Sequence, residues 1–154
     1  MKTEIVRMIE KARKLSNSEW QNLKEELLKS EEDKLNQKES ILTIEERLYQ
    51  LFKEIGIPAH LKGYKFLKKC IILSLENPRM LERITKNLYP AVARECNSTT
   101  SRVERAIRHS IEVVYEIGNL EKLEEIVGNI VSYRKVRPEN SVFIAQVVEY
   151  IRNN

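Results

Sequence analysis

The stretch NSTTSRVERAIRHSIEVVYEIGN, residues 97–119, decides the fold of this chain. It opens with polar residues that are typical of a tight turn, and the three hydroxyl residues at 99–101 are candidate N-caps for a following helix. Gly118 and Asn119 close the stretch with a strong C-cap signal. We therefore expect a helix from about Ser101 to Ile117.

The side chains of this expected helix separate into an apolar arc and a polar arc. The apolar arc, which we expect to be buried, holds Val103, Ala106, Ile107, Ser110, Ile111 and Val114. The polar arc presents Ser101, Arg102, Glu104, Arg105, Arg108, His109 and Glu112. Arginine pairs bidentately with guanine and glutamate accepts from cytosine N4, so the polar arc is suited to reading base edges. Alternatively, it is an ordinary solvated face in which Glu104 and Arg108 form an i,i+4 pair.

Upstream of the turn, apolar residues at helical spacing predict three more helices, over 42–55, 63–75 and 80–95. Gly56 and Pro58 end the first of them. Pro90 lies inside the third, and a break is expected near Leu88 because proline removes an intrahelical hydrogen bond. A helix, a polar turn and a second helix are the layout of a helix-turn-helix, whose second helix enters the major groove of DNA.

Downstream, the pattern predicts a short helix over 120–127, a basic loop over 128–138 and a last helix that is capped by Asn140 or Ser141 and ends near Ile151. Only 6% of the 154 residues are aromatic, and the chain has 4 Gly and 4 Pro. This composition is unlike a β-sandwich or a barrel, so we expect an all-α fold. No signal peptide or bilayer-spanning apolar run is evident, and we expect a cytoplasmic protein without membrane contact.

Residues 3–15 and 19–35 carry two amphipathic helical patterns, and the break between them is expected near 16–18, where Ser16 and Glu19 have capping-box spacing. The stretch 30–40 has one apolar residue in eleven and is expected to be a solvated helix end or a linker. We place the domain boundary there, with a helical pair in 1–40 and a helix-turn-helix domain of about six helices in 41–154. The net charge of +4 lies entirely in 41–154, which carries 18 Lys and Arg against 14 Asp and Glu.

At SRVERAIRH, residues 101–109, the sequence closely resembles the recognition helix of the C-terminal effector domain of the stage-zero sporulation regulator of endospore-forming bacteria. Further blocks match in order and spacing: EIGIPAHLKGY at 54–64, ITKNLYPAVA at 84–93, IEV at 111–113, GNL at 118–120 and PENSVFIA at 138–145. The resemblance covers roughly residues 42–152. It implies an all-α domain of about six helices whose helix-turn-helix binds a short promoter element in double-stranded DNA, usually as head-to-tail pairs.

The resemblance also implies which residues contact DNA. Carried over by position, the residues at base edges are Arg102, Glu104 and Arg105. Those close to the phosphate backbone are Ser101, Arg108 and His109, with Lys62, Lys135 and Arg137 as further candidates, for which ordinary surface charge is the alternative. Gly63, Gly118 and Pro58 match the family too, and a structural role in turns accounts for each of them.

The chain departs from the family in two respects. Forty residues cannot form the family's α/β receiver domain, and Asp33 is the only aspartate, so no aspartyl-phosphate switch is expected. Between Gly118 and Asn140 the match thins, in a region that partly serves polymerase contact in the family. Contact with RNA polymerase is therefore a weaker implication than DNA binding.

The N-terminal segment 1–40 has three possible roles: it folds back on the larger domain, forms a homodimer, or grips another protein. The leading hypothesis is a sequence-specific DNA-binding transcription regulator that lacks a phosphorylatable receiver and is either constitutively competent or regulated through residues 1–40. The alternative is an interaction protein that antagonises a full-length sporulation regulator, against which the retention of Arg102, Glu104 and Arg105 argues. We expect no enzyme activity, cofactor or metal, because nucleophile-base pairs, phosphate loops and metal clusters are missing. Cys70 and Cys96 are expected to be small buried hydrophobes.

Overall fold

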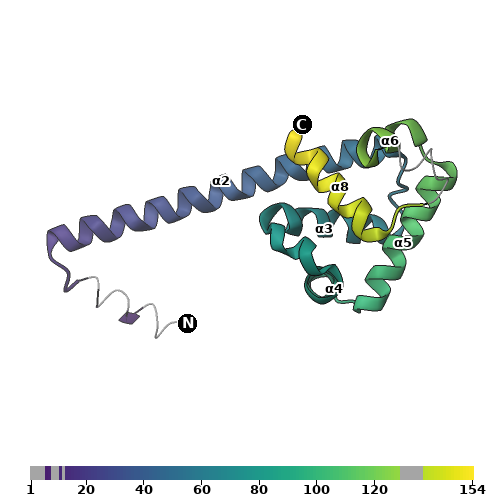
Figure 1. The fold of residues 1–154 in the computed structure, drawn as a ribbon. Helices are drawn as coiled ribbons and strands as arrows, with labels where there is room; N and C mark the ends of the chain where they lie inside the picture. Colours follow the sequence, from purple (N-terminus) through teal and green to yellow (C-terminus); the bar gives the residue numbers. More distant parts are fainter. Residues whose placement is uncertain (1–5, 8–10, 12, 129–136) are drawn as a thin grey trace. The chain divides into compact units, whose positions relative to one another are not determined.

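The computed structural model describes residues 6–7, 11, 13–128 and 137–154, without the side chains of 40–42. This part of the chain contains six α-helices and two shorter helical segments, η1 and η2, and none of its residues forms a strand (Figure 1). The predicted all-α fold is confirmed. The chain divides into an N-terminal unit, residues 1–42, and a C-terminal unit, residues 43–154. Most of the helix predicted over 3–15 lies outside the described residues.

Helix α2 runs from Asn17 to Ile55 and spans both units. Its start has the predicted capping box: the Ser16 backbone N–H donates to a Glu19 carboxylate oxygen at 2.8 Å, and the Glu19 N–H donates to the Ser16 hydroxyl at 3.4 Å. Of the two expectations for residues 30–40, the linker is wrong, because these residues are helical, and residues 30–39 are exposed, as expected of a solvated helix. They include no Gly or Pro and are rich in Glu and Lys, which are good helix formers even on a fully solvated stretch.

The core of the C-terminal unit is built around α3, Lys62–Glu76, and α5, Thr100–Ile117, which pack against each other. The last part of α2 adds Leu48, Phe52 and Ile55, all fully buried. The Phe52 ring meets the Tyr64 ring edge to face, with centroids 5.1 Å apart. These contacts bury the apolar stripe of every core helix and fix which side of α5 faces solvent.

Gly63 sets how closely α3 approaches α5. A Cβ at this position would lie 2.1 Å from the Ala106 carbonyl oxygen and 2.2 Å from the Ser110 hydroxyl oxygen. The expectation that Gly63 serves a turn is therefore wrong, since it lies within α3 and is required by the close contact of two helices. Gly118 is the C-cap of α5, as expected, but its φ of −80° is one that any residue adopts; glycine is required there because a Cβ would lie 2.4 Å from the Val114 carbonyl oxygen and 2.7 Å from the Ile55 carbonyl oxygen.

The third core helix predicted over 80–95 is broken into three pieces. A 3-10 segment, η1, covers Pro78–Arg83, a π-helical turn, η2, covers Ile84–Leu88, and helix α4 covers Tyr89–Glu95. The break predicted near Leu88 is confirmed, and Pro90 then lies in the first turn of α4, where the missing N–H costs no hydrogen bond.

Helix α6, Leu120–Val127, follows Gly118 closely, and helix α8, Asn140–Asn153, closes the unit. Asn119 caps α6 by accepting from the Lys122 N–H at 3.1 Å. The Lys122 ammonium contacts Glu54 of α2 at 3.2 Å, Glu125 at 3.0 Å and the Tyr150 hydroxyl of α8 at 3.2 Å. These contacts join α2, α6 and α8, and the hydrogen bonds to Glu125 and Tyr150 raise the pKa of Lys122.

Candidate nucleic-acid interface

Helices α4 and α5 are joined by a tight turn over residues 96–99. Asn97 has a φ of +50°, a left-handed conformation that asparagine tolerates better than most residues. The Ser98 N–H donates to the Ala93 carbonyl at 2.8 Å and thereby closes the end of α4. Thr99 is the N-cap of α5, because its hydroxyl accepts from the Arg102 N–H at 3.3 Å. The polar stretch read from the sequence is thus the turn of a helix-turn-helix.

The buried and exposed sides of α5 follow the predicted arcs. Val103, Ile107, Ser110, Ile111 and Val114 are buried, and Ala106 is half-buried. On the other side Ser101, Arg102, Arg105, Arg108 and His109 are exposed, while Glu104 and Glu112 are half-buried. The expected reading face is therefore the accessible face of the helix.

Ion pairs divide the cations of this face into two groups. Arg108 pairs with Glu104 at 2.5 Å, and Arg137 pairs with Glu112 across 25 residues of sequence. The His109 imidazole lies 3.9 Å from the other Glu112 oxygen. Among the described residues, none forms an ion pair or a hydrogen bond with the guanidinium group of Arg102 or Arg105. The first two turns of α5 therefore carry two guanidinium groups that are free to bind a ligand.

One flank of α5 brings Lys62 to these two arginines. A hollow there is lined by Lys62 and Phe66 of α3, by residues of the turn, and by Arg102 and Arg105. Lys62 is far from both arginines in the sequence, yet it shares this hollow because α3 crosses α5 at Gly63. The flank is cationic and next to the turn, which suits a phosphate group beside a bound base edge.

The opposite flank of α5 holds the paired cations. A second hollow is lined by Glu104 and Arg108 of α5, by Lys86 of η2, and by Arg137 and Asn140 from the start of α8. Neither Asn140 nor Ser141 caps α8 as expected, because the N-cap is Glu139; the Asn140 side-chain amide instead donates to the Glu104 carbonyl at 3.1 Å. Lys135 lies outside the described residues. Arg137 and Asn140 therefore hold the start of α8 against α5.

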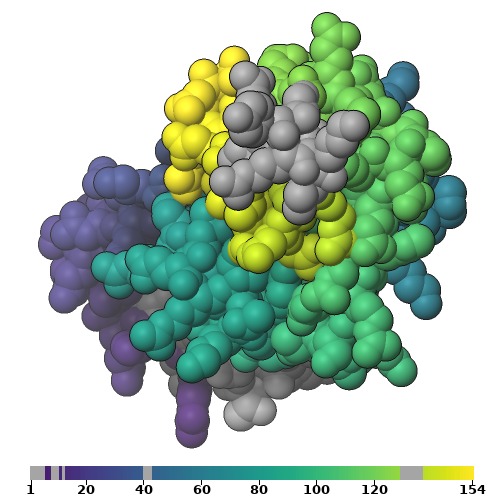
Figure 2. Space-filling model, turned by 45° about the vertical axis from the view of Figure 1, so that its right-hand side comes forward, coloured from purple at the N-terminus to yellow at the C-terminus, as the bar shows by residue number. Residues whose placement is uncertain are grey.

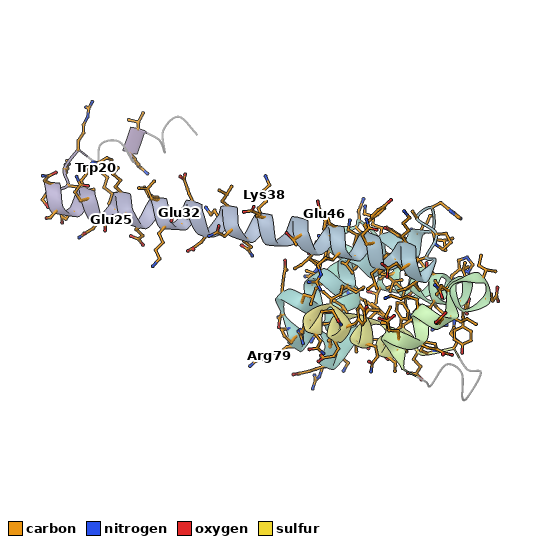
Figure 3. All side chains as sticks on the ribbon, turned by 90° about the horizontal axis from the view of Figure 1, so that it is seen from above. Trp20, Glu25, Glu32, Lys38, Glu46 and Arg79 are labelled. Atoms are coloured by element: carbon orange, nitrogen blue, oxygen red, sulfur yellow. The ribbon has the colours of Figure 1, made fainter. Side chains whose placement is uncertain are left out.

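Three further cations, which the sequence analysis missed, lie beside the turn. Arg79, Lys86 and Arg94 line a hollow together with Ser98, Thr99 and Thr100, and its lining residues include no carboxylate. Arg79 projects outward from the molecule (Figure 3). On the face drawn in Figure 2, the η1–α4 segment, in teal, adjoins α5, in green. In the sequence, Arg79, Lys86 and Arg94 are marked only by their position ahead of the turn, in the part of a helix-turn-helix whose first helix crosses the DNA backbone.

The remaining chemistry of the described residues is sparse. Burial raises the pKa of the Cys70 thiol to about 12, and Cys96 is a half-buried free thiol. Cys70 is thus an inert core residue, as expected. No group of His, Cys, Asp and Glu suited to a metal ion occurs among the residues that the structure describes. In the same part of the chain, none of the helices has the length and apolar character needed to cross a membrane.

A short helix, a capped turn and a second helix with an exposed arginine face define a helix-turn-helix DNA-binding domain. Residues 48–151 match the family model described as Sporulation initiation factor Spo0A C terminal. This match covers more than half of the chain, so the chain belongs to that family, and the resemblance read from the sequence is confirmed. The family is one of DNA-binding domains of sporulation regulators, and it is not an enzyme family.

Proposed function

We propose that this chain is a sequence-specific regulator of transcription that reads promoter elements in double-stranded DNA with α5. The observation that carries the proposal is the pair of exposed arginines, Arg102 and Arg105, directly after the capped turn and with guanidinium groups that have no partners among the described residues. An arginine that has no internal ion pair is available for bidentate contact with guanine O6 and N7. Glu104 is the third base-contacting residue, as an acceptor for cytosine N4.

The phosphate backbone is held on both sides of this reading face. Ser101, Arg108, His109, Lys62, Lys135 and Arg137 are the contacts that the family resemblance supports. To these we add Arg79, Lys86 and Arg94, because they form a carboxylate-free cationic hollow beside the turn. Phosphate contacts fix the register of the protein on the duplex and supply most of the salt-dependent affinity.

A binding titration tests this function. The full chain is titrated against a duplex that carries the promoter element of the family and against a scrambled duplex of equal length, at two salt concentrations. Specific binding predicts a preference for the first duplex of at least about a thousandfold, the lower end for specific DNA-binding proteins. Equal affinity for both duplexes would refute sequence-specific reading and would favour the antagonist role instead.

Two partners follow from the same proposal. A homodimer, through residues 1–40 or on paired sites, would place two reading heads on adjacent elements. RNA polymerase would meet the junction of α5 and α6, where Ile117 and Leu120 are exposed apolar side chains. Replacing both with serine should reduce activated transcription from a target promoter and leave the affinity for its DNA unchanged. A parallel loss of DNA affinity would contradict a polymerase role.

The segment ahead of the C-terminal unit bears on how the regulator is controlled. Residues 17–42 belong to a helix, and Asp33 is the only aspartate of the chain. We propose that DNA binding by this chain does not require an aspartyl phosphate. Treatment with a small-molecule phosphodonor should therefore leave the titration unchanged, and a change in affinity would refute this part of the proposal.

A further inference from the structure

The N-terminal part of α2 carries an apolar stripe that its own unit leaves exposed. Trp20, Leu27, Leu28 and Leu35 are 45%, 58%, 52% and 66% exposed. A single helix cannot bury its own stripe, and most helical stability in proteins comes from packing such a face against a partner. Figure 3 shows Trp20 and Lys38 on one side of α2 and Glu25 and Glu32 on the other.

Two charged residues lie within the same stripe. At 3.6 residues per turn, Lys24 and Glu31 fall inside the arc of about 100° that the four apolar residues span. Among the described residues, none forms an ion pair with either side chain. A partner of this face therefore has to supply a carboxylate opposite Lys24 and a cation opposite Glu31, since unpaired charges are costly to cover.

A second copy of the same stripe, running in the opposite direction, meets both requirements. Reversal about the midpoint between Leu27 and Leu28 exchanges Leu27 with Leu28, Trp20 with Leu35, and Lys24 with Glu31. Two copies of α2 that run antiparallel would thus stack five layers: an apolar layer at each end, a Lys–Glu pair next to each, and four leucines in the centre. A parallel, in-register pair would instead bring Lys24 against Lys24 and Glu31 against Glu31.

We propose that this chain forms an antiparallel homodimer through residues 20–35 of α2, with the twofold axis between Leu27 and Leu28. This inference deepens the dimer of the proposed function by naming its surface and direction. It does not depend on DNA binding. The two copies of residue 35 lie at opposite ends of the paired segment, so each chain continues toward its C-terminal unit from a different end.

Cysteine cross-linking of the full chain tests the direction. In the antiparallel pair, Leu27 lies beside Leu27 of the second copy, whereas the two Leu35 side chains lie at opposite ends. Leu27→Cys should therefore give a disulfide-linked dimer under mild oxidation, and Leu35→Cys should not. The unmodified chain, which carries Cys70 and Cys96, and the outward-facing Glu25→Cys variant are the controls. Cross-linking of both test variants, of neither, or of Leu35→Cys alone would overturn the proposal.

Charge reversal and sedimentation equilibrium test the pairing independently. Lys24→Glu should raise the dimer dissociation constant at least about tenfold, because it leaves like charges facing each other in the pair, and the double variant Lys24→Glu with Glu31→Lys should restore it. Trp20 is the only tryptophan, so its emission should shift to the red on dilution as the dimer dissociates. A monomeric mass at all concentrations, or a double variant as weak as the single one, would overturn the proposal. All of these measurements are made without DNA, so failure here leaves the DNA titration unaffected.

Discussion

At the residue scale, Arg105 is the test of the reading face. It is exposed, its guanidinium group has no partner among the described residues, and it lies near the centre of the polar arc of α5. Arg105→Ala should leave the thermal melt unchanged because no buried contact is lost. Affinity for the cognate duplex should fall by about 1–3 kcal/mol, the usual loss for one bidentate base contact, while affinity for scrambled DNA falls much less.

Lys86→Ala is the matched control for this variant, because Lys86 is proposed to hold phosphate. It should lower the affinity for both duplexes about equally and reduce the salt dependence by roughly one counterion. Binding titrations at several salt concentrations measure both quantities. Full discrimination by an intact Arg105→Ala variant would show that α5 is not the reading helix.

Glu104 has a second effect on binding through its ion pair with Arg108. Glu104→Ala removes an acceptor for cytosine and releases Arg108, which is held at 2.5 Å. Affinity for scrambled DNA should therefore rise several-fold while discrimination between the duplexes falls, since a released cation binds any phosphate. Glu116→Ala, on an exposed position of the same helix, removes the same charge and is the control. If both variants raise non-specific affinity equally, the ion pair does not restrain Arg108.

At the element scale, the contact between α3 and α5 depends on Gly63. Gly63→Ala places a methyl group 2.1 Å from a backbone oxygen, which forces the helices apart. We expect a loss of at least about 1–3 kcal/mol of unfolding free energy, as for other overpacked sites, and weaker DNA binding because Lys62 moves away from α5. Gly128→Ala is the control: it strains a left-handed backbone, with a φ of +81°, but meets no described atom within 4 Å, so it should lower the unfolding free energy and leave DNA affinity unchanged. A melt of Gly63→Ala that matches the wild type would contradict this account.

Interactions between sequence neighbours make the bounds of α5 predictable. The roles that the sequence does not predict belong to residues whose partners lie far away along the chain. The bounds of α5 were predicted within one residue because Thr99 and Gly118 act on their immediate neighbours. The sequence predicts Asn140 as an N-cap of α8, but its side-chain amide donates to the backbone carbonyl of Glu104, 36 residues away. The hollow of Arg79, Lys86 and Arg94 was missed for the same reason, since only the folded chain brings these residues together. Their roles at DNA, like those of the nine residues named from the sequence, stay predictions.

At the scale of the whole molecule, the two units are expected to contribute separately. The C-terminal unit has its own buried core, so a fragment of residues 43–154 should fold and melt cooperatively. On a duplex with one site, this fragment and the full chain should bind with similar affinity. Circular dichroism and a single-site titration check these two expectations before any comparison on paired sites.

On paired sites the full chain should bind more tightly than the fragment, because a dimer turns the second binding event into an intramolecular one. The advantage should be at least about tenfold, and it should disappear in the Lys24→Glu variant, in which the dimer is weakened. An identical loss on single and paired sites after removal of residues 1–42 would show that the N-terminal unit does not link two reading heads.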